Sequence, residues 1–321
     1  MSTPQPAANP LDRLTAEQQQ QTQALIQALA NLLQPTGVDG LQFRFPNAGP
    51  PKVTLHQSPN TPSVVLITLP KSGSMFIRNT LQRDLDLEYA EFSGGYFPHD
   101  LINEWLTQHF SRGSYVFQSH IDADPLNVYQ LARYTPRVVV HVRDPRQATL
   151  SWTHHIDKVH ADPNLRGRLA VAHPDLPGDY FDRPFEGRLQ WQLEHHLPAC
   201  VAWVRGWCEQ SDRPDSPLQI MFTTFADMKA DPASFFAGLL GHYGIDATRL
   251  NQEALHAERR EGTDHFRKGK LDEWRSVFSE AQRIQATQMI DAKLAERFDW
   301  SLDPAEHTRE AIEQQGLAGV A

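Results

Sequence analysis

A lysine, two serines and a glycine lie between an expected buried strand and an expected helix near position 70. Residues 64–68 form a short aliphatic and β-branched run, which is typical of a strand covered on both faces. Ser72, Gly73 and Ser74 follow it and can point backbone N–H groups and hydroxyls at an anion. Lys71 adds a full positive charge to the partial charge of the helix start. This pattern indicates a phosphate site, and the alternative is an ordinary turn with a solvated lysine.

A second strand end supplies a matching arginine. Residues 137–142 form another β-branched run, and Arg143 follows it directly. The pair Asp144 and Pro145 is a standard helix start, and Ser151 lies about two turns into that helix. A guanidinium and a hydroxyl can therefore converge on one phosphate beyond the carboxyl ends of parallel strands. Taken alone, Arg143 fits a surface residue capped by Asp144 better than a phosphate ligand.

These two segments resemble a known family, the sulfotransferases that use 3′-phosphoadenosine 5′-phosphosulfate (PAPS). The run TLPKSGSMF at residues 68–76 is similar to that family's 5′-phosphosulfate loop, TYPKSGTTW. Arg143 with Ser151 resembles its 3′-phosphate site, including the spacing.

Two further elements downstream extend the resemblance. Residues 266–274 resemble the family's RKG…W element. Residues 203–207 and 225–232 are similar to its HVxxWW and YEDMKxDP segments in order and separation. The matches together run from about residue 64 to residue 274.

The resemblance implies which side chains hold the donor. No metal is expected, because side chains and backbone amides meet the phosphate charge, and the product would be adenosine 3′,5′-bisphosphate (PAP). The implied contacts to the 5′ group are Lys71, Ser72, Gly73, Ser74 and Met75, and Phe76 stands where the family's tryptophan stacks on adenine. The implied contacts to the 3′-phosphate are Arg143, Ser151, Arg267, Lys268 and Gly269, and Phe225 is a further donor contact at the tyrosine position of YEDM.

The resemblance also indicates a catalytic base. In the family a histidine in a KTH segment follows the strand that precedes the 3′-phosphate strand, and His120 occupies that place. A hydroxyl acceptor loses a proton as it attacks sulfur, and a neutral imidazole can accept that proton. Lys71 is expected to neutralise the leaving oxygen. Among fifteen histidines, the residues alone do not distinguish His120 from His141 or His154.

Several positions depart from the family pattern. Gln118 stands where the family has the lysine of KTH, so Lys71 could be the only side-chain cation at the transferring group. Met75, Phe76 and Phe225 replace a threonine, a tryptophan and a tyrosine. The two phenylalanines keep an aromatic face for stacking. The residues after position 274 do not reproduce the family's dimerisation element, which leaves the oligomeric state open.

We therefore expect a sulfotransferase that moves the sulfuryl group of PAPS to a hydroxyl of a small-molecule or carrier-bound acceptor. Gln118 and the altered aromatic residues keep a second hypothesis open, a non-catalytic PAP-binding protein on the same fold. A small-molecule kinase is a weaker third, because Lys71 precedes Gly73 and the GxxxxGK loop of nucleotide triphosphatases is absent.

Composition limits the class of protein. The chain has 321 residues, 40% of them hydrophobic, and a net charge of −9, which disfavours a general nucleic-acid binder. It shows neither an apolar run near 18 residues nor a signal-peptide pattern, so no membrane association is expected. Cys200 and Cys208 lie eight positions apart on an expected helix, which favours a reduced, cytoplasmic protein.

The elements that must position these residues alternate between strand and helix. Strands near Val64, Tyr115, Val138 and Leu218 predict an α/β fold, a three-layer, P-loop-like arrangement with a central parallel sheet flanked by helices. Aspartate-proline pairs at 124, 144 and 231 open helices, and Ser279 opens a last long helix to about residue 298.

We expect three parts in the chain. Residues 1–60 form an N-terminal extension with one amphipathic helix opened by Thr15 and ended by Pro35. Residues 61–300 form the sulfotransferase domain, and residues 301–321 a C-terminal tail.

The acceptor side is less specified. Residues 154–189 contain scattered proline, glycine and aromatic residues and show no clear long helix, which suggests a flexible lid. Histidines 154, 155 and 160 fit solvated side chains better than a metal site. Aromatic residues that could line an acceptor cavity, or simply pack, are Tyr96, Phe97, Tyr180, Phe181 and Phe185.

Overall fold

The computed structural model describes residues 61–95, 97–98, 100–111, 113–257 and 269–305. These residues divide into two units, of which one contains residues 159–174 and the other contains the rest of the described chain. The smaller unit holds α6 (Arg166–Ala172). The larger unit contains the sheet and every described element that carries a candidate site residue.

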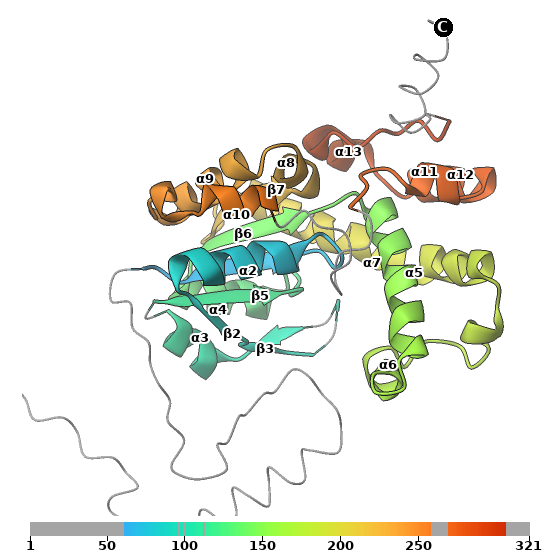
Figure 1. Cartoon of the computed structure of the whole chain (residues 1–321), viewed down its shortest axis with the longest axis horizontal. Helices are drawn as coiled ribbons and strands as arrows, with labels where there is room; N and C mark the ends of the chain where they lie inside the picture. The colour runs from blue at the N-terminus through green and yellow to red at the C-terminus, as the bar shows by residue number, and fades with distance from the viewer. Residues whose placement is uncertain (1–60, 96, 99, 112, 258–268, 306–321) are drawn as a thin grey trace, which may run out of the picture. The chain divides into compact units, whose positions relative to one another are not determined.

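Five parallel strands form the central sheet of the larger unit (Figure 1). In chain order they are β1 (Val64–Thr68), β2 (Glu88–Ala90), β5 (Tyr115–Ser119), β6 (Arg137–Val142) and β7 (Gln219–Thr224). Their spatial order is β2-β5-β1-β6-β7. The chain therefore leaves the central strand β1 toward one edge and crosses back between β5 and β6. Such a reversal opens a crevice at the carboxyl ends of the central strands.

Both faces of the sheet are covered, because side chains alternate along each strand. Val64 and Leu66 of β1 belong to one buried apolar cluster, whereas Val65 and Ile67 belong to another. The first cluster is completed by α2 (Ser74–Leu85), α8 (Phe225–Ala230), α9 (Pro232–Tyr243) and α10 (Gln252–Ala257). The second is completed by α3 (Glu104–Phe110), α4 (Pro125–Tyr134), α5 (Pro145–Ala161), α7 (Phe185–Asp212), α11 (Trp274–Val277), α12 (Glu280–Gln288) and α13 (Ala292–Phe298).

Shorter elements complete the larger unit. An antiparallel pair, β3 (Ser93–Gly94) with β4 (Leu101–Ile102), lies between β2 and α3 in the chain. Two 3₁₀ turns are η3 (Tyr180–Asp182) and η4 (Ala247–Arg249). The predicted α/β class with a helix-flanked parallel sheet is confirmed.

The aspartate-proline pairs begin helices as predicted. Asp124 accepts a hydrogen bond from the N–H of Leu126, and Asp231 accepts one from Ser234. Asp144 accepts one from the N–H of Arg146 at the start of α5. Each side chain satisfies a backbone donor that the first helical turn leaves unpaired.

Three expectations need correction. The helix expected from Ser279 to residue 298 is two helices, since Asp291 accepts from the N–H of Leu294 and starts α13 anew. The stretch 154–189 contains parts of three helices, because α5 extends to Ala161, α6 spans Arg166–Ala172 and α7 begins at Phe185. The short edge strand β2 was not anticipated, since three residues of mixed polarity give little pattern. The predicted N-terminal helix lies outside the described residues.

Cys200 and Cys208 lie on α7, as predicted, and both are buried free thiols. In the described part of the chain, no helix has both the length and the apolar character needed to cross a membrane.

The hydroxyl of Tyr243 contacts the backbone of β1 and β6 near their amino-terminal ends. It accepts from the N–H of Val65 at 3.0 Å and lies 2.9 Å and 3.1 Å from the carbonyl oxygens of Val65 and Arg137. We predict that Tyr243→Phe lowers the free energy of unfolding by about 1–3 kcal/mol, because buried backbone groups lose a partner. Chemical denaturation would measure it.

The matched control is Tyr134→Phe, which removes a hydroxyl bonded to the exposed Glu104. We expect it to change the free energy of unfolding by less than about 0.5 kcal/mol. Equal effects for the two variants would contradict the assigned role of Tyr243.

Candidate functional site

The loop after β1 passes through two left-handed residues before α2 begins. Lys71 has a φ of 64° and Gly73 a φ of 90°. A non-glycine residue in this region is uncommon and tends to mark functional sites. α2 starts at Ser74, and no side-chain cap bonds its start. Its first N–H groups also lack partners inside the helix, so those of Ser74 and Met75 can bind an anion.

Gly73 is required by its surroundings as well as by its backbone angle. A Cβ atom on this residue would lie 2.8 Å from Cε of Met228 and 3.1 Å from the ring of Phe225. Both neighbours belong to α8, which begins where β7 ends. The Lys71 loop is therefore packed tightly against α8, directly after the end of β7.

Arg143 connects this loop to a distant part of the chain. Its Nη1 donates to the carbonyl of Lys71 at 2.8 Å, and its Nη2 donates to the carbonyl of Lys270 at 2.5 Å. The guanidinium carbon lies 4.1 Å from the centre of the Phe225 ring. The side chain is only 8% exposed. Arg143 thus brings the Lys71 loop and the segment after Gly269 together.

The hydroxyl of Ser72 offers a test of whether an anion fits this loop. Ser72 is fully buried, and its Oγ has no hydrogen-bond partner among the described residues. Buried hydroxyls are seldom left unsatisfied in native structures. A phosphate oxygen held by the loop would satisfy this one.

The other residues that the sequence predicts to bind PAPS lie in different surroundings. Gly269 has a left-handed φ of 59° and precedes Lys270. Ser151 is partly exposed on α5, and Phe76 packs edge-on against Phe236 with ring centres 5.7 Å apart. Arg267 and Lys268 lie outside the described residues.

Phe225 does not present an open stacking face. Its ring is 7% exposed and lies against Gly73 and the Arg143 guanidinium. In this structure it supports Arg143 through a cation–π contact.

His120 follows β5 and contacts the end of the neighbouring strand β1. Its Nδ1 lies 2.6 Å from the carbonyl oxygen of Thr68 and 3.2 Å from the Thr68 hydroxyl. A carbonyl oxygen only accepts, so Nδ1 carries the proton and Nε2 has the free lone pair. Burial lowers the pKa of His120 below its ordinary value, only partly opposed by the Thr68 contact and the charge of Asp100. The ring is therefore neutral at pH 7.

Two tryptophans hold the backbone around His120. The indole N–H of Trp203 donates to the carbonyls of His120 at 3.0 Å and Ile121 at 2.8 Å, and that of Trp207 donates to Ile121 at 3.1 Å. The spacing of four places both on one face of α7. The sequence showed this pair without indicating what it contacts.

Gln118 points its amide toward the same place. Its Nε2 donates to the hydroxyl of Thr68 at 3.4 Å, and the side chain is buried. It therefore adds a neutral donor beside His120 where the family pattern has a cation.

Aromatic rings gather beside this region. Trp152, which follows Ser151, stacks on His196 with ring centres 4.9 Å apart, and Phe97 meets the same imidazole edge-on at 5.5 Å. His196 and Trp203 are seven residues apart on α7 and so share one face of that helix.

The other residues that the sequence predicts to line an acceptor cavity do not all join this cluster. Phe185 stacks on His154, whereas Tyr180 is fully buried and donates no surface to an acceptor. Phe181 packs edge-on against Tyr180, and Tyr96 lies outside the described residues.

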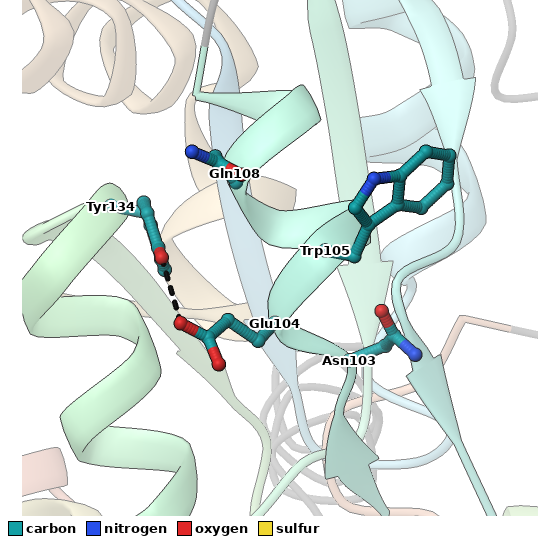
Figure 2. A pocket seen from close by; sticks show the side chains of 5 residues that line it. All are labelled: Asn103, Glu104, Trp105, Gln108 and Tyr134. Carbon is teal, nitrogen blue, oxygen red and sulfur yellow. Dashed lines mark hydrogen bonds between the residues drawn. The ribbon is translucent and has the colours of Figure 1, made fainter. Parts of the chain in front are cut away.

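A pocket separate from the Lys71 loop lies between α3 and the end of α4. Figure 2 shows its lining, formed by Asn103, Glu104, Trp105, Gln108 and Tyr134, with the Tyr134 hydroxyl donating to Glu104. Tyr134 ends α4, just before β6 begins, so this pocket lies toward the amino-terminal edge of the sheet. The Lys71 loop lies at the opposite edge.

Comparison with known proteins gives a consistent result. The family model for the sulfotransferase domain matches residues 61–298. Sulfotransferase 6B1 of Danio rerio is 23% identical over 176 residues, which are 50% of this chain and 52% of that protein. The match thus spans about half the length of this curated relative. The crystal structure of mouse sulfotransferase SULT7A1 complexed with PAP has a TM-score of 0.50 at 16% identity, over 81% of this chain and 89% of the mouse chain. That likeness concerns the fold.

We predict that Gly73→Ala lowers the free energy of unfolding by about 1–3 kcal/mol, because the new Cβ meets Phe225 and Met228 and the backbone stays left-handed. Chemical denaturation would measure the change. Gly244→Ala is the matched control, since Gly244 has a φ of 70° but open space around it. A loss no greater at Gly73 than at Gly244 would show that packing on α8 does not constrain the loop.

Proposed function

Because the chain belongs to the sulfotransferase family, we propose that it transfers the sulfuryl group of PAPS to a hydroxyl of a small-molecule or carrier-bound acceptor. The observation that carries this proposal is the Arg143 contact network. It joins the Lys71 loop to the segment after Gly269 at the carboxyl ends of the central strands. Two phosphate-binding elements from distant parts of the chain are thereby brought side by side.

The 5′ group of the donor is assigned to the loop. The N–H groups at the start of α2 and the hydroxyls of Ser72 and Ser74 supply donors, and Lys71 supplies a charge. The 3′-phosphate is assigned to Arg143, Ser151 and Gly269. An arginine has five N–H donors in a planar fork that matches phosphate geometry, and Arg143 donates to the carbonyls of Lys71 and Lys270. Arg267 and Lys268 are proposed as further contacts on the sequence pattern alone.

The transfer itself exchanges one sulfur–oxygen bond for another. The acceptor oxygen bonds to sulfur, the bond from sulfur to the 5′-phosphate oxygen breaks, and PAP leaves with that electron pair. The acceptor proton goes to Nε2 of His120, which the Thr68 contact leaves unprotonated. Catalysis then depends on alignment and on positive charge at the leaving oxygen. No metal is invoked in this scheme.

The aromatic cluster on the face of α7 that carries Trp203 suggests the acceptor's character. Trp152 and Phe97 are partly exposed and pack on the buried His196, and their rings suit an alcohol or phenol with a flat apolar part. Buried free thiols at Cys200 and Cys208 suit a reducing, cytoplasmic setting. The clustered rather than general distribution of cations on a chain of net charge −9 does not favour nucleic acid as a partner.

Lys71→Ala tests the role of the cation. We expect transfer from PAPS to a panel of alcohols and phenols to fall by at least about 100-fold, because charge on the leaving oxygen is no longer neutralised. PAP binding, measured by calorimetry, should weaken by no more than about tenfold, since one of several phosphate contacts is lost. Lys293→Ala, on the exposed side of α13, is the control. Undiminished transfer by Lys71→Ala would contradict the assignment.

The same assays separate the two functions that Gln118 leaves open. Wild-type protein that binds PAP but transfers nothing to any acceptor would support a non-catalytic PAP-binding protein. Wild-type protein that neither binds PAP nor turns over PAPS would overturn the proposed function.

The assignment of His120 predicts a pH dependence. Burial lowers the pKa of His120 from its ordinary value of 6.5. As the pH falls, the ring therefore becomes protonated only below pH 6.5. We therefore expect kcat/KM for PAPS to be flat near pH 7 and to decline on an acid limb centred below pH 6.5. A pH-rate profile measures it.

His120→Ala should lower kcat by about 100- to 10,000-fold and abolish that limb. His195→Ala, which removes an exposed histidine on α7, should leave the profile unchanged. An acid limb that survives in His120→Ala would assign the proton acceptor to another group.

A further inference from the structure

A second histidine lies directly beneath the Lys71 loop, and the proposed chemistry does not use it. His141 is the next-to-last residue of β6 and is fully buried. Its Nε2 lies 2.9 Å from the carbonyl oxygen of Ser72, and its Nδ1 lies 2.9 Å from the hydroxyl of Thr223 on β7. β6 pairs with β1 on one side, where Thr68 is opposite His141, and with β7 on the other, where Thr223 is opposite.

These two contacts determine the tautomer of the ring. The Ser72 carbonyl can only accept, so Nε2 carries the proton, and Nδ1 must then accept from the Thr223 hydroxyl. Burial lowers the pKa of His141 to about 4, which keeps the ring neutral at pH 7. Among residues 138–142 of β6, His141 is the only one that is not valine. An aliphatic side chain would fill this place without bringing two ring nitrogens out of water.

The contact with Ser72 has a geometric consequence for the next residue. In a trans peptide the carbonyl and the following N–H point in opposite directions. Holding the Ser72 oxygen toward β6 therefore turns the N–H of Gly73 away from the sheet. That N–H directly precedes the N–H groups of Ser74 and Met75 that open α2.

We propose that His141, oriented by Thr223, is a positioning residue that fixes the Ser72–Gly73 peptide so that its N–H binds the 5′-phosphate of the donor. The inference rests on the proposed function and deepens it. His141 does not touch the donor, and it acts through the loop backbone. The 3′-phosphate is assigned to Arg143 and its neighbours, and the loop contact of Arg143 is to the carbonyl of Lys71, not to the Ser72–Gly73 peptide.

The test compares two ligands that differ only in the 5′-phosphate. Calorimetry would measure PAP and adenosine 3′-monophosphate binding to wild-type protein and to three variants. For His141→Leu we expect PAP to bind about 10- to 100-fold more weakly, because a charge-assisted contact is misaligned. Binding of adenosine 3′-monophosphate should change by less than about threefold, because this ligand lacks the phosphate that the Ser72–Gly73 N–H would bind.

Two further variants keep the inference testable if His141→Leu does not fold. His141→Gln retains an N–H donor near the Nε2 position and should recover most of the PAP affinity. Thr223→Val keeps the shape but frees the ring tautomer, and it should weaken PAP binding by a few fold. Nitrogen-15 NMR of wild-type protein should show a neutral His141 protonated on Nε2.

The outcomes distinguish this inference from the function beneath it. Equal weakening of both ligands by these variants would show a merely structural histidine, and unchanged PAP affinity or protonation on Nδ1 would also overturn the inference. Each of these results leaves the proposed function intact, provided that wild-type protein binds PAP. Failure of wild-type protein to bind PAP would instead overturn the proposed function, and this inference with it.

Discussion

The site depends on the contacts of one guanidinium, that of Arg143, which is almost completely shielded from water. Burying a charge is costly unless it is hydrogen-bonded, and Arg143 meets that requirement with the carbonyls of Lys71 and Lys270 and the face of Phe225. Three segments that are far apart in the chain must therefore come together before this charge is satisfied. The loop, the end of β7 and the segment after Gly269 are held in place by one side chain.

The order of the strands explains why these segments meet. β1 lies between β5 and β6, so the residues after these strands emerge side by side at one edge of the sheet. His120 follows β5, the Lys71 loop follows β1, and Arg143 follows β6. Phe225 follows β7, which pairs with β6. These roles are thus carried by the first residues beyond a strand, where the backbone is still held by its neighbours.

Local signals in the sequence were enough for much of this fold. The valine-rich runs predicted β1 and β6, and the aspartate-proline pairs predicted the starts of α4, α5 and α9. Features that depend on which strands become neighbours were not predictable in this way. The pairing of His141 with Thr223, the support of Arg143 by Phe225 and the tryptophan contacts to the His120 backbone all join residues more than 80 positions apart. His120 itself needed the family resemblance, because fifteen histidines look alike without their surroundings.

The contact between His120 and Thr68 has a consequence for how the two halves of the site stay in register. Thr68 is the last residue of β1, and Lys71 follows three positions later. The carbonyl that orients the imidazole and the lysine of the loop therefore belong to the same short piece of main chain. A shift of β1 would move the Thr68 carbonyl and Lys71 together. The separation between these two groups would therefore stay the same. The position of the imidazole relative to the lysine backbone is therefore set by the short main-chain segment from Thr68 to Lys71.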